Sequence, residues 1–277
     1  MGISFTEKVS VIIPNYNYAR YVDQAIESVL NQTYKNIELI VVNNGSTDDS
    51  LEVVSKYSDR IKLINQDNLG QSGSRNSGLR AVTGNLIAFL DADDFWEKDK
   101  IEKQLLLISE EVQLVYCGVS TFRESGIQIV DFLSPKYRGD CHDYFIQVPG
   151  GSIVLSGEST ALFSTTLLNK VGLFDEELNS AAGWDFFRRC SKFTDFDFTD
   201  EFLTHYRLHD SNMSNSSVNT IRDMRKAYNK MFHDTDWQIS TTQEDNLRRA
   251  LEYTYLKTHI KNLNLKLAIN SIIKLIR

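Results

Sequence analysis

The sequence predicts an α/β fold in which a doubly wound, mostly parallel sheet carries helices on both faces, followed by a C-terminal helical tail. Two observations lead to this fold class. Over the first hundred residues, short apolar runs alternate with amphipathic stretches at the spacing of βαβ units. The last sixty residues then place Arg, Lys and Leu at helical spacing. Repeated βαβ units build a sheet with right-handed crossovers, whose ligands bind beyond the carboxyl ends of the strands.

Four buried strands are expected in the first half of the chain, because four short apolar runs are each closed by polar residues. They cover residues 9–13, 37–42, 61–64 and 86–90. Between the first two, apolar side chains at i, i+4, i+7 and i+8 predict a helix over 22–30. Ser46 and Asp49 form a capping box for the next helix. A third helix is expected over 71–82.

The alternation changes after Asp94. Residues 120–150 mix Gly, Ser, Pro and charges without a clear period, as a variable loop region does. The remaining expected elements are helices over 101–108, 164–171 and near 184–192, and strands over 112–119 and near 203–208. We therefore divide the chain into a ligand-binding half of one domain, a second half of the same domain and a helical extension, at 1–105, 106–217 and 218–277.

Composition and charge exclude several classes of protein. The 277 residues are 42% hydrophobic and 24% charged, as in an ordinary globular protein with a sizeable core. The 37 acidic and 30 basic residues give a net charge of −7, the wrong sign for a dedicated nucleic-acid binder. Three cysteines without CxxC spacing predict free thiols. Because there is neither an 18-residue apolar run nor a signal-peptide pattern, we expect a cytoplasmic protein.

Three carboxylates follow the fourth predicted strand, at Asp91, Asp93 and Asp94. Like charges this close repel each other unless water or a cation lies between them. A divalent cation held by one or two carboxylates and by phosphate oxygens fits the cluster. The other interpretation makes these residues the acidic start of the next helix. The glycines match neither GxGxxG nor a Walker loop, which disfavours dehydrogenases and NTPases.

Four motifs occur in order along the first half: VSVIIPNYN at 9–17, NNGSTDDS at 43–50, NLGQSGSRNSGL at 68–79 and FLDADD at 89–94. With these motifs the chain resembles the nucleotide-binding half of family 2 inverting glycosyltransferases, which have the GT-A fold. The resemblance is close over 8–105 and looser at 172–175, 184–185 and 206–209.

The resemblance implies a site for a nucleotide-diphosphate sugar. The donor would be bound by Pro14, Tyr16, Asn43, Asn44, Arg75, Asp91 and Asp93. Residues 91–93 would form the DxD motif, with Asp91 near the ribose and Asp93 on the metal. His209 would be a second ligand of a divalent cation, Mn²⁺ or Mg²⁺. An arginine such as Arg75 can pair with a diphosphate.

The chain departs from the family pattern at two places. Asn43 and Asn44 stand where the family has an acidic pair. An Asn carbonyl can also accept the N3–H of uracil, so a UDP-sugar is the first candidate donor without being fixed. The family also has an acidic residue before an aromatic–Asp pair, whereas this chain has Gly183 there.

A shift of one or two residues would make Asp185 the catalytic base, with Trp184 stacked on the acceptor sugar. The other interpretation makes Asp185 an ordinary first-turn residue favoured by the helix dipole, and Glu158 and Asp175 are then the next candidates for the base.

We therefore expect a metal-dependent enzyme that moves one sugar, with inversion, from a nucleotide-diphosphate donor to a hydroxyl of a glycan or lipid-linked saccharide, as in polysaccharide biosynthesis. One alternative is a sugar-phosphate nucleotidyltransferase, although its Gly-rich basic loop is missing after the first strand. Another is a non-catalytic protein that only binds nucleotide-sugars. The two departures from the family pattern, at Asn43-Asn44 and at Gly183, would be compatible with such a protein.

The last residues of the tail, 261–277, interleave Leu and Ile with Lys and Arg. A helix of this composition could lie on the anionic inner face of a membrane and bring the enzyme to a lipid-linked acceptor. The other interpretation is that its apolar side chains dock on the chain's own domain or on a second subunit.

Overall fold

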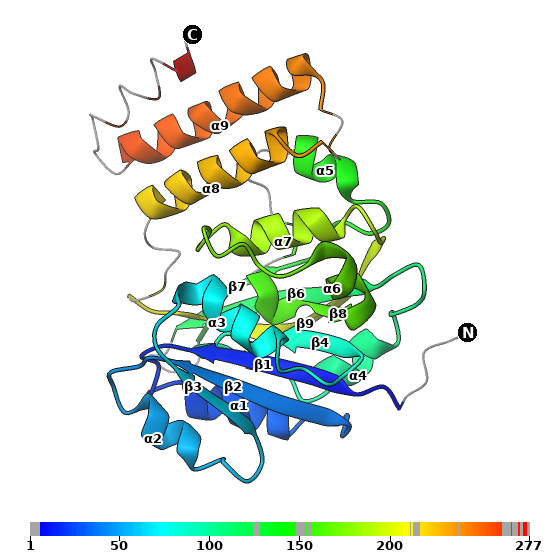
Figure 1. Cartoon of the computed structure of the whole chain (residues 1–277), viewed down its shortest axis with the longest axis vertical. Helices are drawn as coiled ribbons and strands as arrows, with labels where there is room; N and C mark the ends of the chain where they lie inside the picture. The colour runs from blue at the N-terminus through cyan, green and yellow to red at the C-terminus, as the bar shows by residue number, and fades with distance from the viewer. Residues whose placement is uncertain are drawn as a thin grey trace.

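A curled sheet runs through the centre of the structure, and helices cover both of its faces (Figure 1). This computed structural model describes residues 6–123, 128–147, 153–154, 157–210, 212, 217–235, 237 and 239–261, and the single residues 267, 271, 274 and 275. The outermost helices stack at the end of the molecule where the chain ends.

Parallel strands form the first half of the sheet, in the order β3-β2-β1-β4. They are β1 (Val9–Asn15), β2 (Ile37–Asn44), β3 (Lys62–Gln66) and β4 (Leu86–Phe89). These strands confirm the four that the apolar runs predict. Asn15 lies opposite Asn43 in the register of β1 and β2, so their polar ends meet at one edge of the sheet.

Helices pack on both faces of these strands, which confirms the doubly wound arrangement. Val11 and Ile13 of β1 face one core with α1 (Val22–Leu30), α2 (Ser50–Ser55) and α4 (Lys100–Leu105). Ile12 points to the opposite face, where α3 (Gly70–Leu79) packs. A Cβ at Gly78 would overlap Ile12 Cγ2, so α3 lies closer to β1 than a side chain there would allow.

The second half of the sheet is mixed, unlike the first half, where every pairing is parallel. The order continues β4-β8-β6-β9-β5, with β7 also paired to β6. The long strands β6 and β9 run parallel, while β4/β8, β8/β6, β9/β5 and β6/β7 are antiparallel. The bounds are β5 (Phe95–Trp96), β6 (Leu114–Arg123), β7 (Gln128–Leu133), β8 (Leu162–Ser164) and β9 (Phe196–Leu208).

Regular elements also occur in the region that we expected to be a variable loop. Residues 120–150 contain the end of β6, all of β7 and the helix α5 (His142–Gln147). The strands β5 and β8 have two and three residues, too few to show a period. The 3₁₀ turn η1 (Gly157–Thr160) precedes β8, which leads directly into α6 (Thr165–Val171).

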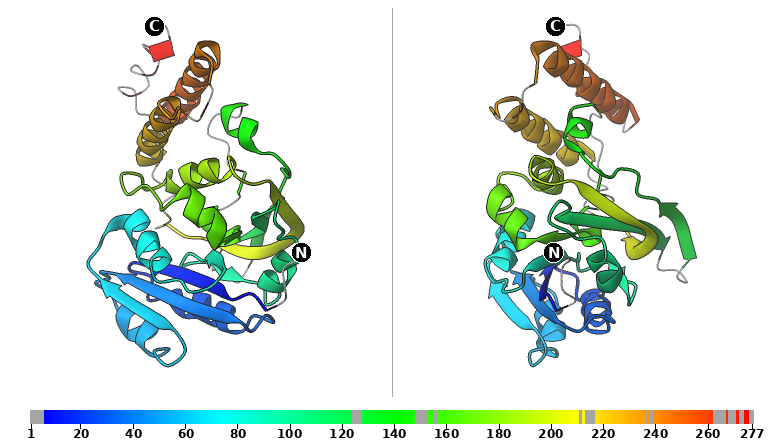
Figure 2. Two further views of the ribbon diagram at one scale, coloured as in Figure 1. Left: turned by 45° about the vertical axis from the view of Figure 1, so that its right-hand side comes forward. Right: turned by 90° about the vertical axis from the view of Figure 1, so that its right-hand side faces the viewer.

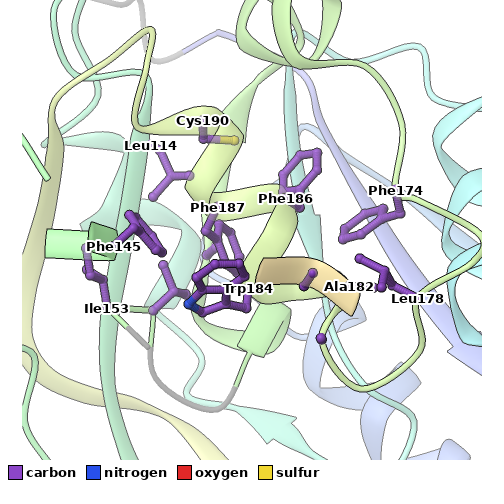
Figure 3. Close-up of a cluster of buried hydrophobic side chains, with 14 of the residues drawn as sticks. Leu114, Phe145, Ile153, Phe174, Leu178, Ala182, Trp184, Phe186, Phe187 and Cys190 are labelled. Atoms are coloured by element: carbon purple, nitrogen blue, oxygen red, sulfur yellow. The ribbon is translucent and has the colours of Figure 1, made fainter. Parts of the chain in front are cut away.

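Three helices stack beyond the sheet: α7 (Ala182–Cys190), α8 (Ser217–Phe232) and α9 (Thr241–Lys261). Figure 2 shows α8 and α9 on the side of α7 that faces away from β1 to β3. Trp184 of α7 points into a cluster that also holds Phe145 of α5 (Figure 3). Its ring centroid lies 4.5 Å from that of Tyr228 of α8, so this outer layer shares the core of the domain.

The described part of the C-terminal tail is helical, and α8 and α9 pack on the chain's own domain. The interpretation of 261–277 as a membrane-facing segment lies almost entirely outside the described residues. Within the described ranges, no helix combines the length and the apolar character that a membrane span requires.

Candidate active site

A pocket of about 950 Å³ opens at the carboxyl ends of β1, β2 and β4. Its volume lies within the range of small-molecule sites, and its place is the one expected for a ligand of such a sheet. Residues 14–18 after β1, 91–93 after β4 and 157–158 of η1 line it. Gly183 and Trp184 at the start of α7 close the opposite wall.

Of the three carboxylates after β4, Asp91 and Asp93 line the pocket, whereas Asp94 is buried below it. Asp94 accepts hydrogen bonds from the backbone N–H of Arg207 at 3.1 Å and from Ser159 Oγ at 3.1 Å. Burial raises the pKa of Asp94 well above its usual range, and the neighbouring Asp93 and Asp91 raise it further. Asp94 therefore connects β4, η1 and β9 and does not face a ligand.

Asp93 and His209 lie side by side, although 116 residues separate them in the sequence. Asp93 Oδ2 is 3.0 Å from His209 Nε2, and the ring of Tyr21 stacks on the imidazole at 5.1 Å. Burial raises the pKa of Asp93, and the charge of Asp91 adds to the shift. Burial also raises the pKa of the Tyr18 hydroxyl, which hydrogen-bonds to Asp93.

A divalent cation fits this corner of the pocket. A carboxylate oxygen and an imidazole nitrogen are suitable ligands for Mn²⁺, and a cation would stabilise the Asp93 anion, whose pKa is raised by burial and by the charge of Asp91. Among the described residues, no group of three or more His, Cys, Asp and Glu side chains is placed to hold a metal. Phosphate oxygens of a bound nucleotide would therefore have to complete the coordination, as is common for Mg²⁺ sites.

Arg75 is a fixed cation within the wall of the pocket. Only 2% of the residue is exposed, although its guanidinium borders the ligand space. The same Nη2 donates to Asp91 Oδ1 at 3.2 Å and to Glu158 Oε2 at 2.9 Å. Arg75 therefore joins the carboxylate after β4 to the carboxylate of η1.

The amides of Asn43 and Asn44 are occupied by other protein groups. Asn44 lines the pocket, but its oxygen accepts from Gln66 Nε2 and the Leu69 N–H, and its nitrogen donates to Asn68 Oδ1 and the Gly70 carbonyl. These four bonds use the full capacity of the amide.

Asn43 is not part of the lining and donates to Asn65 Oδ1 at 2.8 Å. The geometry therefore does not support direct base recognition by these two amides, and they hold the pocket rim instead.

Several buried polar atoms of the pocket have no hydrogen-bond partner within the described part of the chain. They are Asn15 Oδ1, Ser74 Oγ, Arg75 Nε and Glu158 Oε1. Each such atom costs about 1–3 kcal/mol when it stays unpaired. The lining is therefore built to receive a polar ligand. Asn15 lies between the predicted residues Pro14 and Tyr16, and Ser74 lies in the motif at 68–79 without having been singled out. Glu158 lies outside the four motifs, as one of several acidic residues between 150 and 210.

The geometry does not support a catalytic base at Asp185. Its carboxylate does not line the pocket, and only 3% of the residue is exposed. One oxygen accepts from Arg188 Nη2 and the other from Arg189 Nε, each at 2.9 Å. Asp185 thus pairs with two arginines of its own helix, which agrees with its interpretation as an ordinary residue of the first helical turn. Trp184 does line the pocket, but most of its ring lies in the core with Phe145 and Tyr228.

An α/β domain with a nucleotide-sized pocket at the strand ends and carboxylates after β4 has the arrangement expected for the GT-A fold. The model of the family described as "Glycosyl transferase family 2" matches residues 10–153. An uncharacterized glycosyltransferase of Nostoc sp. is 32% identical over 265 residues, 90% of this chain and 82% of that protein. One of Rickettsia typhi is 31% identical over 223 residues, 79% and 70% of the two chains. The chain belongs to glycosyl transferase family 2 and is a glycosyltransferase.

Solved structures support the same fold. Staphylococcus aureus TarS in complex with UDP-GlcNAc superposes with a TM-score of 0.69 at 20% identity, covering 95% of this chain and 79% of that one. A mannosyltransferase from Pyrobaculum calidifontis, solved with GDP-Man and Mn²⁺, superposes with a TM-score of 0.62 at 16% identity, covering 97% and 74%. The family assignment agrees with the resemblance that the four sequence motifs indicate.

Proposed function

We propose that this glycosyltransferase moves one sugar from a nucleoside-diphosphate sugar to a saccharide hydroxyl, with inversion, and that it uses a divalent cation. The observation that carries the proposal is the set of unpartnered polar atoms around Arg75, beside the pair of Asp93 and His209. A nucleoside diphosphate supplies anionic oxygens for the arginine and for a metal, and a ring N–H donor for the amide oxygen of Asn15.

The residues of the pocket have distinct roles in this proposal. Asp93 and His209 would hold the cation, which when bound would neutralise the charge of the departing diphosphate. Pro14 and Tyr16 would frame the nucleotide, because Tyr16 is 45% exposed at the rim after β1. Asp91 would contact the ribose, and the hydrogen bond from Arg75 would hold the Asp91 carboxylate in place.

The acceptor side of the pocket lies at the start of α7. Trp184 presents one edge of its ring to the pocket, which suits contact with an acceptor sugar. An inverting transfer is a direct displacement, in which a base takes the acceptor proton from the face opposite the leaving group. A lipid-linked saccharide is one acceptor class that would suit a basic, apolar C-terminal segment, at the inner face of the membrane.

The donor is tested by thermal shift with UDP, GDP, UDP-GlcNAc and GDP-Man, each with and without MnCl₂. A nucleotide at 100 times its Kd stabilises the folded state by about 2.7 kcal/mol, which should raise the Tm by roughly 5 °C or more. We expect the largest shift with a UDP compound and Mn²⁺ together. Release of the nucleoside diphosphate from the preferred donor, measured by chromatography, then shows turnover.

Asp93→Ala tests the metal site. The variant should keep its fold but lose the Mn²⁺-dependent part of the Tm shift. The matched control is Asp59→Ala, which removes an exposed carboxylate before β3, at the end of the sheet opposite the pocket. An undiminished response to Mn²⁺ in Asp93→Ala would contradict the metal placement. The absence of any nucleotide effect in the unmodified protein would contradict the donor class.

A further inference from the structure

Glu158 is a carboxylate whose two oxygens have different environments. The residue lies in the 3₁₀ turn η1, and 5% of it is exposed. Oε2 accepts from Arg75 Nη2 at 2.9 Å, whereas Oε1 has no partner within the described part of the chain. An anionic oxygen that is buried without a hydrogen-bond donor is costly, so it needs a function or a ligand to offset it.

The unpartnered oxygen of Glu158 points to the wall formed by α7. A Cβ on Gly183 would lie 2.5 Å from Glu158 Oε1, so any larger residue at this position would displace the carboxylate from its present place. Ala182 and Trp184, on either side of Gly183 in the sequence, are drawn in Figure 3, where both belong to the core cluster beneath the pocket. Glu158, Gly183 and Trp184 therefore form one corner of the lining.

Glu158 differs from the other acidic groups of the pocket. Within the described lining, the carboxylates are Asp91, Asp93 and Glu158, and the lining contains no His or Lys. Asp91 accepts from Arg75, and Asp93 lies against His209. Glu158 Oε1 is the carboxylate oxygen of the described lining that is buried without a hydrogen-bond donor, which makes it the candidate acceptor for the proton of a bound hydroxyl.

We propose that Glu158 is the general base of the transfer, an assignment that rests on the proposed function. The acceptor hydroxyl gives its proton to Glu158 Oε1 while its oxygen bonds to the anomeric carbon of the donor sugar. The bond from that carbon to the diphosphate oxygen breaks, and its electron pair leaves with the diphosphate. The carboxyl then loses the proton to solvent as the products leave.

The surroundings of Glu158 suit this task. Burial raises the pKa of its carboxyl, the guanidinium of Arg75 on α3 lowers it, and the charge of Asp91 after β4 raises it. A general base is most effective when its pKa lies near the working pH, and a raised carboxyl pKa moves in that direction. Arg75 is then a positioning residue, because it fixes Oε2 and leaves Oε1 free for the proton.

The direct test is Glu158→Gln, which keeps the size of the side chain and removes the proton-accepting charge. The assay follows release of the nucleoside diphosphate from UDP-GlcNAc, UDP-glucose, UDP-galactose and GDP-Man with MnCl₂ and water as acceptor, using the fastest donor. We expect kcat to fall about 10²-fold or more, while the Kd of UDP with Mn²⁺, measured by calorimetry, changes less than about threefold. Glu52→Gln, at an exposed position of α2, is the matched control and should keep full turnover.

A pH profile separates a base from a structural residue. At saturating donor and MnCl₂, loss of kcat below the pKa of an essential base should be visible for the unmodified protein and absent for Glu158→Gln. Turnover of Glu158→Gln equal to that of the unmodified protein, with the same acid limb, would overturn the assignment. A loss of UDP binding as large as the loss of turnover would also overturn it, because it would show a binding or structural role.

A second pair of variants moves the carboxylate to the other side of the same corner. Glu158→Ala opens the space that a side chain at Gly183 needs, and Gly183→Asp supplies a new carboxylate from α7. We expect the double variant to turn over at least about tenfold faster than Glu158→Ala alone. If Glu158→Gln does not fold, this comparison decides: no gain in the double variant overturns the proposal. An unmodified protein that neither turns over a donor nor binds UDP with Mn²⁺ would instead overturn the proposed function itself.

Discussion

Replacing Arg75 with Met should destabilise the protein strongly at pH 8 and much less at pH 5.5. The guanidinium is 2% exposed and donates to Glu158 Oε2 at 2.9 Å and to Asp91 Oδ1 at 3.2 Å. Met keeps much of the length of the side chain without the charge. Glu158 would then be a buried carboxylate that has lost its described donor.

The size of the effect follows from burial. Removing one partner of a buried ion pair costs about 3–5 kcal/mol. Asp91 has 26% of its side chain exposed and can recover hydration, so most of the cost falls on Glu158, whose side chain is 7% exposed.

The sign of the pH dependence follows from the same contacts. Burial already raises the pKa of Glu158 in the folded state, and loss of Arg75 removes the group that lowers it. A carboxyl whose pKa is raised by folding contributes stability below its unfolded pKa, near 4.5, and loses that contribution as the pH rises through the folded pKa. The difference between the unmodified protein and Arg75→Met should therefore shrink by about 1 kcal/mol or more between pH 8 and pH 5.5.

Urea denaturation followed by circular dichroism at the two pH values measures this difference. The double variant Arg75→Met/Glu158→Gln removes both charges and should recover about 2 kcal/mol relative to Arg75→Met. An Arg75→Met protein that is equally destabilised at both pH values, and that Glu158→Gln does not rescue, would refute the reasoning.

Three further predictions follow from the site. Asp185→Asn should lower the stability by about 2–4 kcal/mol, because Arg188 and Arg189 lose their shared anion, yet change kcat less than about threefold. Asn44→Asp should cost about 2–4 kcal/mol, since a carboxylate cannot donate to the two acceptors that the amide nitrogen serves, and the Tm should fall by roughly 5–10 °C. Binding of Mn²⁺ together with UDP, measured by calorimetry, should weaken as the pH falls, because the raised pKa of Asp93 makes this ligand bind a proton earlier than an ordinary aspartate.

Each of these predictions has a definite contrary result. A loss of kcat by 10²-fold or more in a folded Asp185→Asn protein would return the general base to that position. An unchanged Tm in Asn44→Asp would show that its four hydrogen bonds do not hold the rim. An affinity for Mn²⁺ and UDP that is constant from pH 8 to pH 5 would contradict a metal ligand at Asp93.

The sequence was sufficient to predict the first half of the fold, where strands and helices alternate in βαβ units. The strands β1, β2 and β4 are apolar runs that are mostly buried on both faces, so their hydrophobicity alone identifies them, whereas β3 is an edge strand with exposed residues. The polar end of β4 locates Asp91 and Asp93 at the pocket. The strands β5 and β8 could not be predicted, because strands of two and three residues depend on pairing with distant partners. Their pairing with β9 and β4 makes the second half of the sheet mixed.

The residues of the candidate site could also be predicted only in part. The motif at 89–94 and His209 could be predicted, and the structure brings Asp93 and His209 within 3.0 Å. Glu158 could not be singled out from the other acidic residues between 150 and 210, because its role in our proposal depends on Arg75, 83 residues earlier, and on the space left by Gly183. The absence of an acidic side chain at Gly183 was the usable signal, because it directed the search for the base to other acidic residues.

The contacts of β4 and Asp94 have a consequence for recombining this enzyme with its relatives. The boundary at residue 105, natural from the sequence, cuts between elements that depend on each other: β4 pairs with β8, β5 pairs with β9, and Asp94 is held by Ser159 and Arg207. A fragment ending there would expose a bare strand edge and a buried carboxyl without its donors. Chimeras that exchange acceptor specificity should therefore keep 157–164 and 196–208 with the parental first half, and exchange the segments between and beyond them.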